Sequence, residues 1–490
     1  MSNDMSRRDF ACFAAITGGA ALAGFDLRSR SWVLQSQEQQ PGLQRLPTLD
    51  GTLSLDLATR TAIAVDGGNM SHRIPAAVLR PGSVRDVVRM VQYANQHSLK
   101  VATKGDGHSQ WGQTQADAGI VIDSRSLGAI TLRNDSSVDV QPGAFWGGVA
   151  LVTIARGLTP RVVPATCMAL TVGGTLSVGG IGASSHRYGA LVDNVLELDV
   201  VTGDGRLVTC SPKRESELFD MVLAGQGQCG VIVRARIPLM TAPSHVSYRE
   251  LTYSDLDAYL ADQQRLLASD HFESQRGRAV RTGAGGWSFV VEVGKFLSKA
   301  SQPDDSWSGN GLHFDTAAAP RRMTYQEFLF RWETGNAAST RPSPGITMWI
   351  PASAAKEFLG GILATSPEAL GVTHPSRGEA ISLYPLNTRR FGRPLFKVPG
   401  EAQAFAVWLF RSVPTGNERA LTAMLASNHE LLKKMTAVGG KRYAPYSSIL
   451  SPAEWSTHFG AELYARLGAA KAKYDPNRVL SPSPAMFAER

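Results

Sequence analysis

Cysteine is scarce in this chain, and no metal-binding spacing is present. The 490 residues include four cysteines, Cys12, Cys167, Cys210 and Cys229, with no C-x-x-C pair among them. The ten histidines form neither H-x-x-x-H nor H-E-x-x-H. A disulfide scaffold and a dithiol redox centre are therefore excluded, and we predict no metal site.

Charge of one sign is not concentrated anywhere. Lys and Arg number 50 against 42 Asp and Glu, which gives a net charge of +8 without a long basic run. This spread argues against a dedicated nucleic-acid binder, although it permits weak attraction to an anionic cofactor. Hydrophobic residues make up 43% and charged residues 19%, which is the composition of an ordinary globular protein with a large core.

The N-terminal apolar run is too short to span a membrane. It has sixteen uncharged residues from Phe10 to Phe25, whereas a span needs about 20. Arg7 and Arg8 precede it, and Ala21-Leu22-Ala23 forms an A-x-A cleavage site. This order predicts a twin-arginine export signal over residues 1–23, and hence a periplasmic or secreted protein without a membrane span. Because that route carries folded proteins, often around a cofactor, we expect a cofactor.

The pattern of the remaining chain changes near Ser244, which predicts two domains. Residues 24–55 form a polar lead-in, and the Pro-punctuated segment 471–487, apolar at its end, is expected to dock on the rest. Apolar spacing predicts helices over 84–97, 258–267 and 417–436, and strands over 101–103, 119–122, 138–140, 289–293, 347–350 and 380–383.

Two glycine-rich loops, 104–113 (KGDGHSQWGQ) and 171–182 (TVGGTLSVGGIG), are the candidate binding elements. Glycine lets the backbone approach a ligand closely and leaves N–H groups free to bind an anion. Two such loops predict a large phosphorylated ligand, and the alternative is a pair of turns in a β-rich domain. The segment 225–230 (GQGQCG) matches G-x-G-x-x-G, but it follows a helix-like segment and precedes a strand-like one, the reverse of a dinucleotide fingerprint.

His108 lies in the first loop, where its glycine neighbours leave the imidazole unshielded. A reactive role is one interpretation, and a hydrogen-bonded structural histidine is the other. The same loop does not match the G-x-S-x-G elbow of serine hydrolases, because Trp111 stands where the second glycine is needed.

A longer set of motifs carries a family resemblance. The two loops are followed in order by ELFDMVLAGQGQCGVIVRARI, YPLN, KRYAP, EWSTHFG and KYDPNRVLSPSPAMF. With these motifs the chain resembles cytokinin dehydrogenases, which are FAD flavoproteins of the vanillyl-alcohol-oxidase type. The resemblance implies an α+β fold with a PCMH-type FAD-binding domain in two parts, residues 56–243 and the returning tail 466–490. A substrate-binding cap domain over residues 244–465 would be inserted between them.

The resemblance also implies the residues of the site. His108 would be joined covalently to the 8α carbon of the flavin. The implied FAD contacts are Thr103, Lys104, Gly105, Asp106, Gly107, His108, Ser109 and Gln113 in the first loop, Thr166, Thr171, Gly173, Gly174, Ser177 and Ile181 around the second, and Ile232, Tyr443 and Ser481 beyond them. Hydroxyl groups and glycine N–H groups are suitable partners for a pyrophosphate and a flavin edge.

Two departures from the family pattern bear on chemistry. Where the family has an Asp that accepts a hydrogen bond and a proton from the substrate amine, this chain has Thr166. A hydroxyl is no base near pH 7, and a positioned base contributes roughly 10²- to 10⁴-fold to rate. The family's P-G-Q in the tail is Pro482-Ser483-Pro484 here, so a Gln contact to the flavin is missing.

Cys167 adds a further feature beside Thr166. It stands at the spacing at which berberine-bridge-type oxidases place a cysteine that attaches to flavin C6, and the alternative is a small buried hydrophobe. The expected function is an exported FAD-dependent oxidoreductase that takes hydride from a C–H next to nitrogen or oxygen, with oxygen or a quinone-like molecule as electron acceptor. Glu292, on the strand-like FVVEV, is the acidic residue predicted nearest the cap pocket, and the alternative is an ordinary paired or solvated carboxylate.

Two other functions stay open from the sequence. One is a carbohydrate or alcohol oxidase of the berberine-bridge type, which a flavin held by both His108 and Cys167 would support. The other is a flavin-binding protein without turnover, which the missing Asp and Gln would explain.

Overall fold

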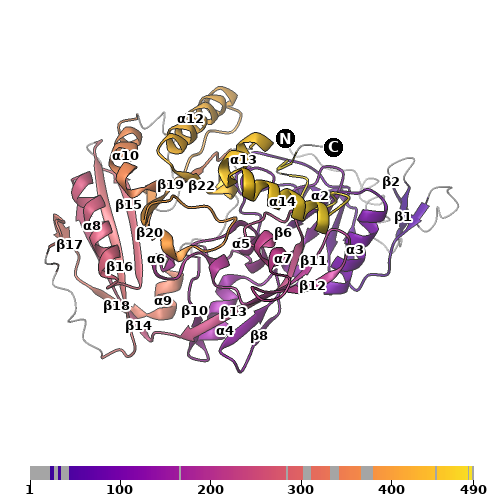
Figure 1. Ribbon diagram of the computed structural model, residues 1–490, viewed down its shortest axis with the longest axis horizontal. Helices are drawn as coiled ribbons and strands as arrows, with labels where there is room; N and C mark the ends of the chain where they lie inside the picture. The colour runs from indigo at the N-terminus through magenta and orange to yellow at the C-terminus, as the bar shows by residue number, and fades with distance from the viewer. Residues whose placement is uncertain are drawn as a thin grey trace, which may run out of the picture.

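The computed structural model describes residues 22–26, 31–34, 43–164, 167–282, 285–301, 309, 311–331, 341–365, 379–446, 450–483 and 485–487. Figure 1 shows two lobes side by side, one built on a four-stranded and a six-stranded sheet and the other on a nine-stranded sheet. Sheets and helices occur together in both lobes, which confirms the predicted α+β class. None of the helices within these ranges is long and apolar enough to cross a membrane.

The four-stranded sheet supports the first glycine-rich loop. Its order is β4 (Thr52–Ser54), β5 (Ala77–Arg80), β7 (Ile120–Asp123) and β6 (Val101–Lys104), with β7 parallel to both of its neighbours. Helix α3 (Val84–Gln96) crosses between β5 and β6, and its apolar face packs on the sheet with Met90 and Val91 fully buried. The predicted helix and strands of this region are confirmed. Parallel strands that meet a crossover helix leave their carboxyl ends at one edge, where the loop after β6 begins.

The described part of the expected lead-in contains four short strands. Strands β1 (Leu22–Asp26), β2 (Ser31–Leu34) and β3 (Leu43–Arg45) form a small sheet, and β4 joins the four-stranded one. Asp86 explains this order around β4, because its carboxylate accepts hydrogen bonds from the backbone N–H groups of residues 50, 51 and 82 at 2.7–2.8 Å. Helix α2 (Leu57–Ile63) follows, capped by Asp56. The predicted export signal lies mostly in residues outside the described ranges.

The six-stranded sheet supports the second loop. Its strands are β8 (Ile130–Leu132), β9 (Ser137–Val140), β10 (Leu158–Pro160), β11 (Glu197–Val201), β12 (Leu207–Cys210) and β13 (Val231–Thr241), in the order β12-β11-β13-β9-β8 with β10 on β13. The helices are α4 (Trp146–Ile154), α5 (Val172–Val178), α6 (Ser185–Tyr188) and α7 (Ser216–Val222). Side chains of α4, α5 and α7 share one apolar core with the inner face of this sheet.

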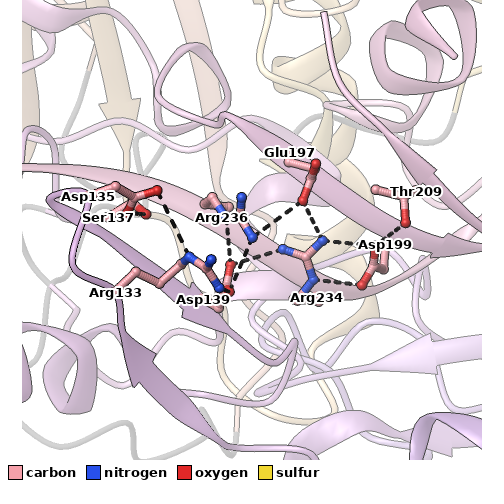
Figure 2. Close-up of polar contacts among 9 residues, drawn as sticks. All are labelled: Arg133, Asp135, Ser137, Asp139, Glu197, Asp199, Thr209, Arg234 and Arg236. Carbon is pink, nitrogen blue, oxygen red and sulfur yellow. Dashed lines mark hydrogen bonds and ion pairs between the residues drawn. The ribbon is translucent and has the colours of Figure 1, made fainter. Parts of the chain in front are cut away.

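The other face of this sheet carries an ion-pair network, which Figure 2 shows. Arg234 is its hub: its guanidinium contacts Asp199 at 2.6 Å, Glu197 at 2.7 Å and Asp139 at 2.9 Å. Burial alone raises the pKa of Asp139, but hydrogen bonds from neighbouring arginines and the charge of Arg234 lower that pKa overall. The pKa of Asp199 is lowered in the same way, again against the effect of burial. The network therefore stabilises the sheet only while these carboxylates are ionised.

The nine-stranded sheet forms the second lobe. Its strands are β14 (His245–Tyr253), β15 (Ser274–Arg281), β16 (Trp287–Leu297), β17 (Thr316–Ala317), β18 (Arg321–Thr324), β19 (Ile346–Pro351), β20 (Glu379–Asn387), β21 (Gln403–Leu409) and β22 (Lys441–Arg442). The order along the sheet is β17-β14-β16-β15-β20-β21-β19-β22, with β18 on β14. The helices of this part are α8 (Leu256–Ser269), α9 (Tyr325–Phe330), α10 (Ala355–Leu363) and α12 (Glu418–Ala437).

Strand alternation divides this sheet into two unlike faces. Apolar side chains such as Val291, Leu383 and Val407 pack under α8 and α10 in one core. The alternate positions on the opposite face include Glu292, with Arg276 directly across in the strand register. Further along that face, Tyr384 and Trp349 belong to the core shared with the first lobe. The predicted strands 289–293, 347–350 and 380–383 and both predicted helices of this part are confirmed.

The C-terminal segment returns to the first lobe. After α13 (Pro452–Phe459) and α14 (Ala461–Tyr474), Leu480 forms a parallel bridge to Val101 of β6. The Val101 N–H donates to the carbonyl of Val479 at 2.8 Å, and the Ser481 N–H donates to the carbonyl of Val101 at 2.8 Å. Figure 1 shows α14 lying over this lobe.

A buried ion pair closes the turn that leads into this segment. The Lys471 ammonium lies 2.6 Å from Asp475, and neither side chain is more than 5% exposed. The Asp475 carboxylate also accepts the N–H groups of Val479 at 2.8 Å and Leu480 at 2.9 Å, while Lys471 donates to the Leu480 carbonyl at 2.9 Å. The docking predicted for the tail thus rests on charge as well as on apolar contact.

Candidate active site

The first glycine-rich loop follows β6 and is held by hydrogen bonds to the segment that follows α2. The Gly67 N–H donates to the carbonyls of Gly107 at 2.7 Å and Ser109 at 2.9 Å. The buried Asp66 carboxylate accepts the Gly112 N–H at 2.7 Å, and desolvation raises the pKa of this carboxyl. Gly107 has φ of +79°, a conformation that glycine adopts without strain. These hydrogen bonds therefore fix the backbone on both sides of His108.

Lys104 holds the same loop from beneath. Its ammonium donates to the carbonyl of Ile63 at 2.8 Å and also to that of Val65, and a Cβ on Gly107 would lie 2.3 Å from Lys104 Cε. Burial lowers the pKa of Lys104 to about 8, against the charge of Asp66. The Lys104 side chain thus anchors the loop. Of this predicted FAD contact, only the Lys104 backbone is left to bind a ligand.

His108 is half-buried and lies edge-on to Tyr446, with ring centroids 5.8 Å apart. Burial lowers the pKa of His108 below its usual value, and the opposing charge of Asp106 is weaker. The imidazole is therefore neutral near pH 7 and keeps a nitrogen lone pair. Burial followed by the charges of Tyr443, Cys167 and Asp106 raises the pKa of Tyr446, so Cys167 and His108 both lie near this tyrosine.

The second loop touches the first one directly. Thr171 is buried before α5, and a Cβ on Gly105 would lie 2.0 Å from its Oγ1. A Cβ on Gly173 would lie 2.6 Å from Pro142, so the start of α5 is also closed to any side chain there. The Ser177 hydroxyl donates to the Gly173 carbonyl at 2.8 Å. The geometry brings the two predicted binding loops together and requires glycine at their contact.

The G-x-G-x-x-G segment lies at the same place. The Gln226 N–H donates to the Ser177 carbonyl at 2.8 Å, and the Ser481 hydroxyl donates to the Gly227 carbonyl at 3.1 Å. Gln228 donates from its side chain to the Ser481 carbonyl at 3.1 Å. The segment is no dinucleotide fingerprint, as expected from its flanks, but the sequence interpretation missed its place beside the loops. Its clustered glycines, the criterion applied to the other two loops, are the signal that could have found it.

Tyr443 connects the second lobe to the second loop. Its hydroxyl accepts the Gly180 N–H at 3.1 Å, and its ring lies 5.2 Å from that of Trp349 and 5.7 Å from that of Tyr446. Desolvation raises the pKa of Tyr443 above its usual value, so the hydroxyl stays protonated. An aromatic wall therefore stands beside the loop that carries His108.

The remaining predicted residues have these positions. Thr103 is half-buried in β6, Gln113 accepts the Trp111 N–H with its side chain at 2.8 Å, and Gly174 lies in α5 beside Thr171. Ile232 is buried in β13 within the main core, and half-buried Ile181 packs against that core. Thr166 lies outside the described residues, as does Pro484 of the tail triplet, and both interpretations stay predictions.

Glu292 lies in the second lobe, with 2% of its side chain exposed. Its Oε1 accepts a hydrogen bond from Arg278 Nε at 3.0 Å, and its Oε2 lies 3.9 Å from Arg276 Nη1. The carboxylate is thus held between two guanidinium groups, which matches the paired alternative. Its predicted catalytic role stays a prediction. The described residues contain no group of three or more His, Cys, Asp or Glu side chains placed to hold a metal ion.

Comparison with known proteins defines the class first. Residues 75–211 match the family model of an FAD binding domain. A solved structure of 6-hydroxy-D-nicotine oxidase from Arthrobacter nicotinovorans superposes with a TM-score of 0.68 at 21% identity, covering 88% of this chain and 97% of that one. The chain therefore has the fold of a PCMH-type FAD flavoprotein.

The family follows from closer relatives. Residues 309–487 match the model "Cytokinin dehydrogenase 1, FAD and cytokinin binding". The chain is 33% identical to cytokinin dehydrogenase 9 of Oryza sativa subsp. japonica, covering 92% of this chain and 93% of the relative. It is 34% identical to an uncharacterized oxidoreductase of the fasciation locus of Rhodococcoides fascians, over 89% of this chain and 98% of the relative. The chain belongs to the cytokinin dehydrogenase family and is an FAD-dependent oxidoreductase.

The residues present fit an FAD. Three polar side-chain atoms just after His108 are buried and have no hydrogen-bond partner among the described residues: Gln110 Oε1, Trp111 Nε1 and Thr114 Oγ1. Buried polar atoms are rarely left unpaired in native proteins, so these atoms are available to a polar ligand or water. Gly105 and Gly107 let the backbone of the same loop pack closely on the Thr171 and Lys104 side chains, where a Cβ would clash.

Proposed function

We propose that this protein is an exported oxidoreductase that takes hydride from a C–H next to nitrogen or oxygen, with FAD attached covalently through His108. Bound FAD supplies the hydride acceptor. The observation that supports the attachment most directly is the state of His108. It is neutral, half-buried and fixed on both sides by the Gly67 N–H, so one imidazole nitrogen is available to bond carbon. A small-molecule substrate and an electron acceptor such as oxygen or a quinone are implied.

The described residues divide the remaining tasks. Backbone N–H groups of the first loop at Gly105 and Gly107 bind the pyrophosphate, and the Gln110, Trp111 and Thr114 side chains offer further hydrogen bonds. Trp349, Tyr384 and Tyr443 belong to a buried core shared by the two lobes, and they would exclude water from the reacting carbon. The family resemblance implies further FAD contacts from both loops, from Ile232 in β13 and from Ser481 in the tail.

A second link to the flavin, through Cys167, is the alternative to a single link at His108. Cys167 is half-buried, so it differs from the fully buried Cys210 and Cys229, whose pKa values burial raises to about 12. Because Cys167 and His108 both lie near Tyr446, one ring system can reach both side chains. This arrangement favours the berberine-bridge-type oxidase of a carbohydrate or alcohol as the second candidate function.

The colour of acid-precipitated protein tests the covalent assignment, because covalent flavin stays with the pellet. We expect a yellow pellet from the parent protein and from Cys167→Ser, and a colourless one from the double variant His108→Ala with Cys167→Ser. His108→Ala alone should be colourless unless Cys167 holds the ring by itself. His97→Gln, which changes a partly buried histidine at the C-terminal cap of α3, is the control and should stay yellow. A colourless parent pellet from cells with ample FAD would contradict the assignment.

Thr166→Asp tests the substrate. If Thr166 occupies the place of the missing base, the carboxylate should accept a proton from an amine, and anaerobic flavin reduction by an isoprenoid cytokinin should quicken. The gain is at most the roughly 10²- to 10⁴-fold of a well-placed base, and it should fall as pH drops toward the reference carboxyl value of about 3.9. Thr166→Asn is the matched control. An unchanged rate with flavin and fold intact would argue against a pocket shaped for an adenine.

Reduction by other substrates separates the two candidate functions. Anaerobic bleaching of the flavin by amines and recovery in air supports the first function. Bleaching by sugars or alcohols alone supports the second.

A further inference from the structure

The end of the second glycine-rich loop is held between the two lobes. On its first-lobe side, the 3₁₀ helix η3 (Leu191–Asp193) donates two backbone N–H groups, to the carbonyls of Gly179 at 3.2 Å and Gly180 at 2.9 Å. On its second-lobe side, Phe396 packs so closely that a Cβ on Gly179 would lie 2.1 Å from its ring. The position of this loop end therefore depends on both neighbours.

Phe396 also packs against the aromatic wall beside the His108 loop. Its ring centroid lies 5.8 Å from that of Trp349 and 6.0 Å from that of Tyr443. The preceding residue, Leu395, is also buried, and a Cβ on Gly225 would lie 3.3 Å from its Cδ1. Leu395 and Phe396 thus contact the second loop, the segment 225–230 and the aromatic wall at once, so a shift of these two side chains would change the surroundings of a bound flavin.

Asp193 joins the turn before these two side chains to η3. Its Oδ1 accepts the N–H groups of Gly392 at 2.9 Å and Arg393 at 3.1 Å, while its Oδ2 accepts the Ala190 N–H at 2.8 Å. The Phe396 N–H donates in turn to the Arg393 carbonyl at 3.1 Å. A single carboxylate therefore connects the first lobe to the turn that carries Phe396, and it uses both of its oxygens to do so.

The charge of the Asp193 carboxylate is only partly compensated. Burial raises the pKa of Asp193, and this effect exceeds the lowering by the N–H groups and by the charge of Arg393. Arg393 also pairs with Asp220 on α7 at 2.9 Å, so the two carboxylates share one cation. Arg187 on α6 pairs with carboxylates of the second lobe, and the Arg390 side chain is exposed. Because folding raises the pKa of this carboxyl, its ionised form costs stability, which is typical of a residue with a functional task.

We propose that Asp193 is a positioning residue for the flavin: by joining η3 to the turn at 392–393, its carboxylate fixes Leu395 and Phe396 against the glycine-rich segments. A protonated carboxyl keeps one good acceptor oxygen and gains a donor, so it cannot serve Ala190 and the turn together. Acid should therefore release the turn as pH falls through the raised pKa of Asp193. The inference requires bound FAD, but it requires neither the covalent link nor the substrate proposed above.

Visible circular dichroism of the flavin-loaded protein reports the surroundings of the flavin without turnover. The parent spectrum should change reversibly with a midpoint above the unfolded carboxyl value of about 3.9. Asp193→Asn should show the acid spectrum at every pH, because Asn also has a single acceptor oxygen, and its melting temperature at pH 7 should equal or exceed that of the parent. Asp270→Asn is the matched control: it removes a carboxylate at the lobe interface that is 60% exposed, at a left-handed position that Asn tolerates, and it should titrate as the parent does.

Phe396→Leu tests whether Asp193 acts through this side chain. It should shift the spectrum at pH 7 and remove most of the acid-dependent change, and adding Asp193→Asn should then change little. The proposal is overturned if the parent shows no spectral change between pH 7 and pH 4, or if Asp193→Asn keeps the parent midpoint. A melting temperature of Asp193→Asn well below the parent value would indicate a purely structural role and also overturn it, as would a full effect of Asp193→Asn in the Phe396→Leu background. A colourless acid pellet would refute only the covalent link, since dissociable flavin gives the same dichroism signal.

Discussion

The Asp475→Asn variant examines how the C-terminal segment is held at the cofactor loop. The substitution leaves the Lys471 ammonium without its partner at 2.6 Å, at a site where neither side chain is more than 5% exposed. Asn has one side-chain oxygen, so it cannot accept all the hydrogen bonds that the two Asp475 oxygens accept from Lys471, Val479 and Leu480. Breaking a buried pair on one side costs about 3–5 kcal/mol. Each 1.4 kcal/mol is a factor of ten, so local opening should rise on the order of 10²- to 10⁴-fold.

Hydrogen exchange of two backbone amides measures that opening. The Val101 N–H bonds to the Val479 carbonyl and the Ser481 N–H to the Val101 carbonyl, so both exchange only when the segment detaches. Glu217→Gln is the control, because its pair with Lys473 is about half exposed on both sides and should contribute less than about 1 kcal/mol. Exchange in Asp475→Asn no faster than in Glu217→Gln would refute this account of the tail.

The pH dependence gives a second check on the same variant. Burial lowers the pKa of Lys471 even with Asp475 present. Without Asp475 the ammonium should lose its proton still more readily. When the pKa of a lysine is lower in the folded than in the unfolded protein, the folded protein becomes more stable as pH rises from the folded to the unfolded pKa. The excess exchange of Asp475→Asn should therefore shrink above neutral pH, and adding Lys471→Met should remove most of that pH dependence.

Three further predictions concern other parts of the chain. Arg234→Met should reduce stability above pH 4 and flatten its loss below that pH. The lowered pKa of Asp139 contributes its full stability above the unfolded carboxyl value of about 3.9, and this stability is lost as pH falls from there toward the folded pKa; acid titration by circular dichroism measures the loss. Gly105→Val should abolish flavin absorbance because its Cβ would lie 2.0 Å from Thr171 Oγ1, whereas Gly361→Ala, in open space, should keep it. Replacing Arg7 and Arg8 by Lys should leave flavin-bearing protein in the cytoplasm, and unchanged secretion would refute the predicted signal.

Local periodicity made much of the fold predictable. The helix at 84–97 and the strands at 101–103 and 289–293 are defined by residues close in sequence, and each is found within two residues of its expected ends or inside a longer strand. The sequence predicted that the loops of Gly105 and Thr171 bind one ligand, but it did not predict that the two residues touch. The two loops are attached to different sheets, so their contact depends on how those sheets pack. Without the family resemblance, nothing in either loop indicates that they meet.

Strand register is what the sequence could not supply. Glu292 faces Arg276 because β15 and β16 pair in one particular alignment, and a shift of one residue would have turned it to the apolar face. The pairing of Glu292 with Arg276 and Arg278 therefore could not be predicted from the sequence. The segment 225–230 was interpreted only against the dinucleotide fingerprint, and its contact with Ser481 depends on a tail that lies more than 250 residues further along the chain.

The bridge between Leu480 and Val101 also sets an order of assembly during synthesis. The edge of β6 stays uncovered until residue 481 has left the ribosome, long after the loop with His108 has emerged. The nine-stranded sheet, whose strands run from His245 to Arg442, can form in that interval, because it pairs only its own strands. Closing so distant a contact is slow, since the loop entropy precedes any gain. The cofactor loop is therefore completed last, by the segment translated last of those that contact it.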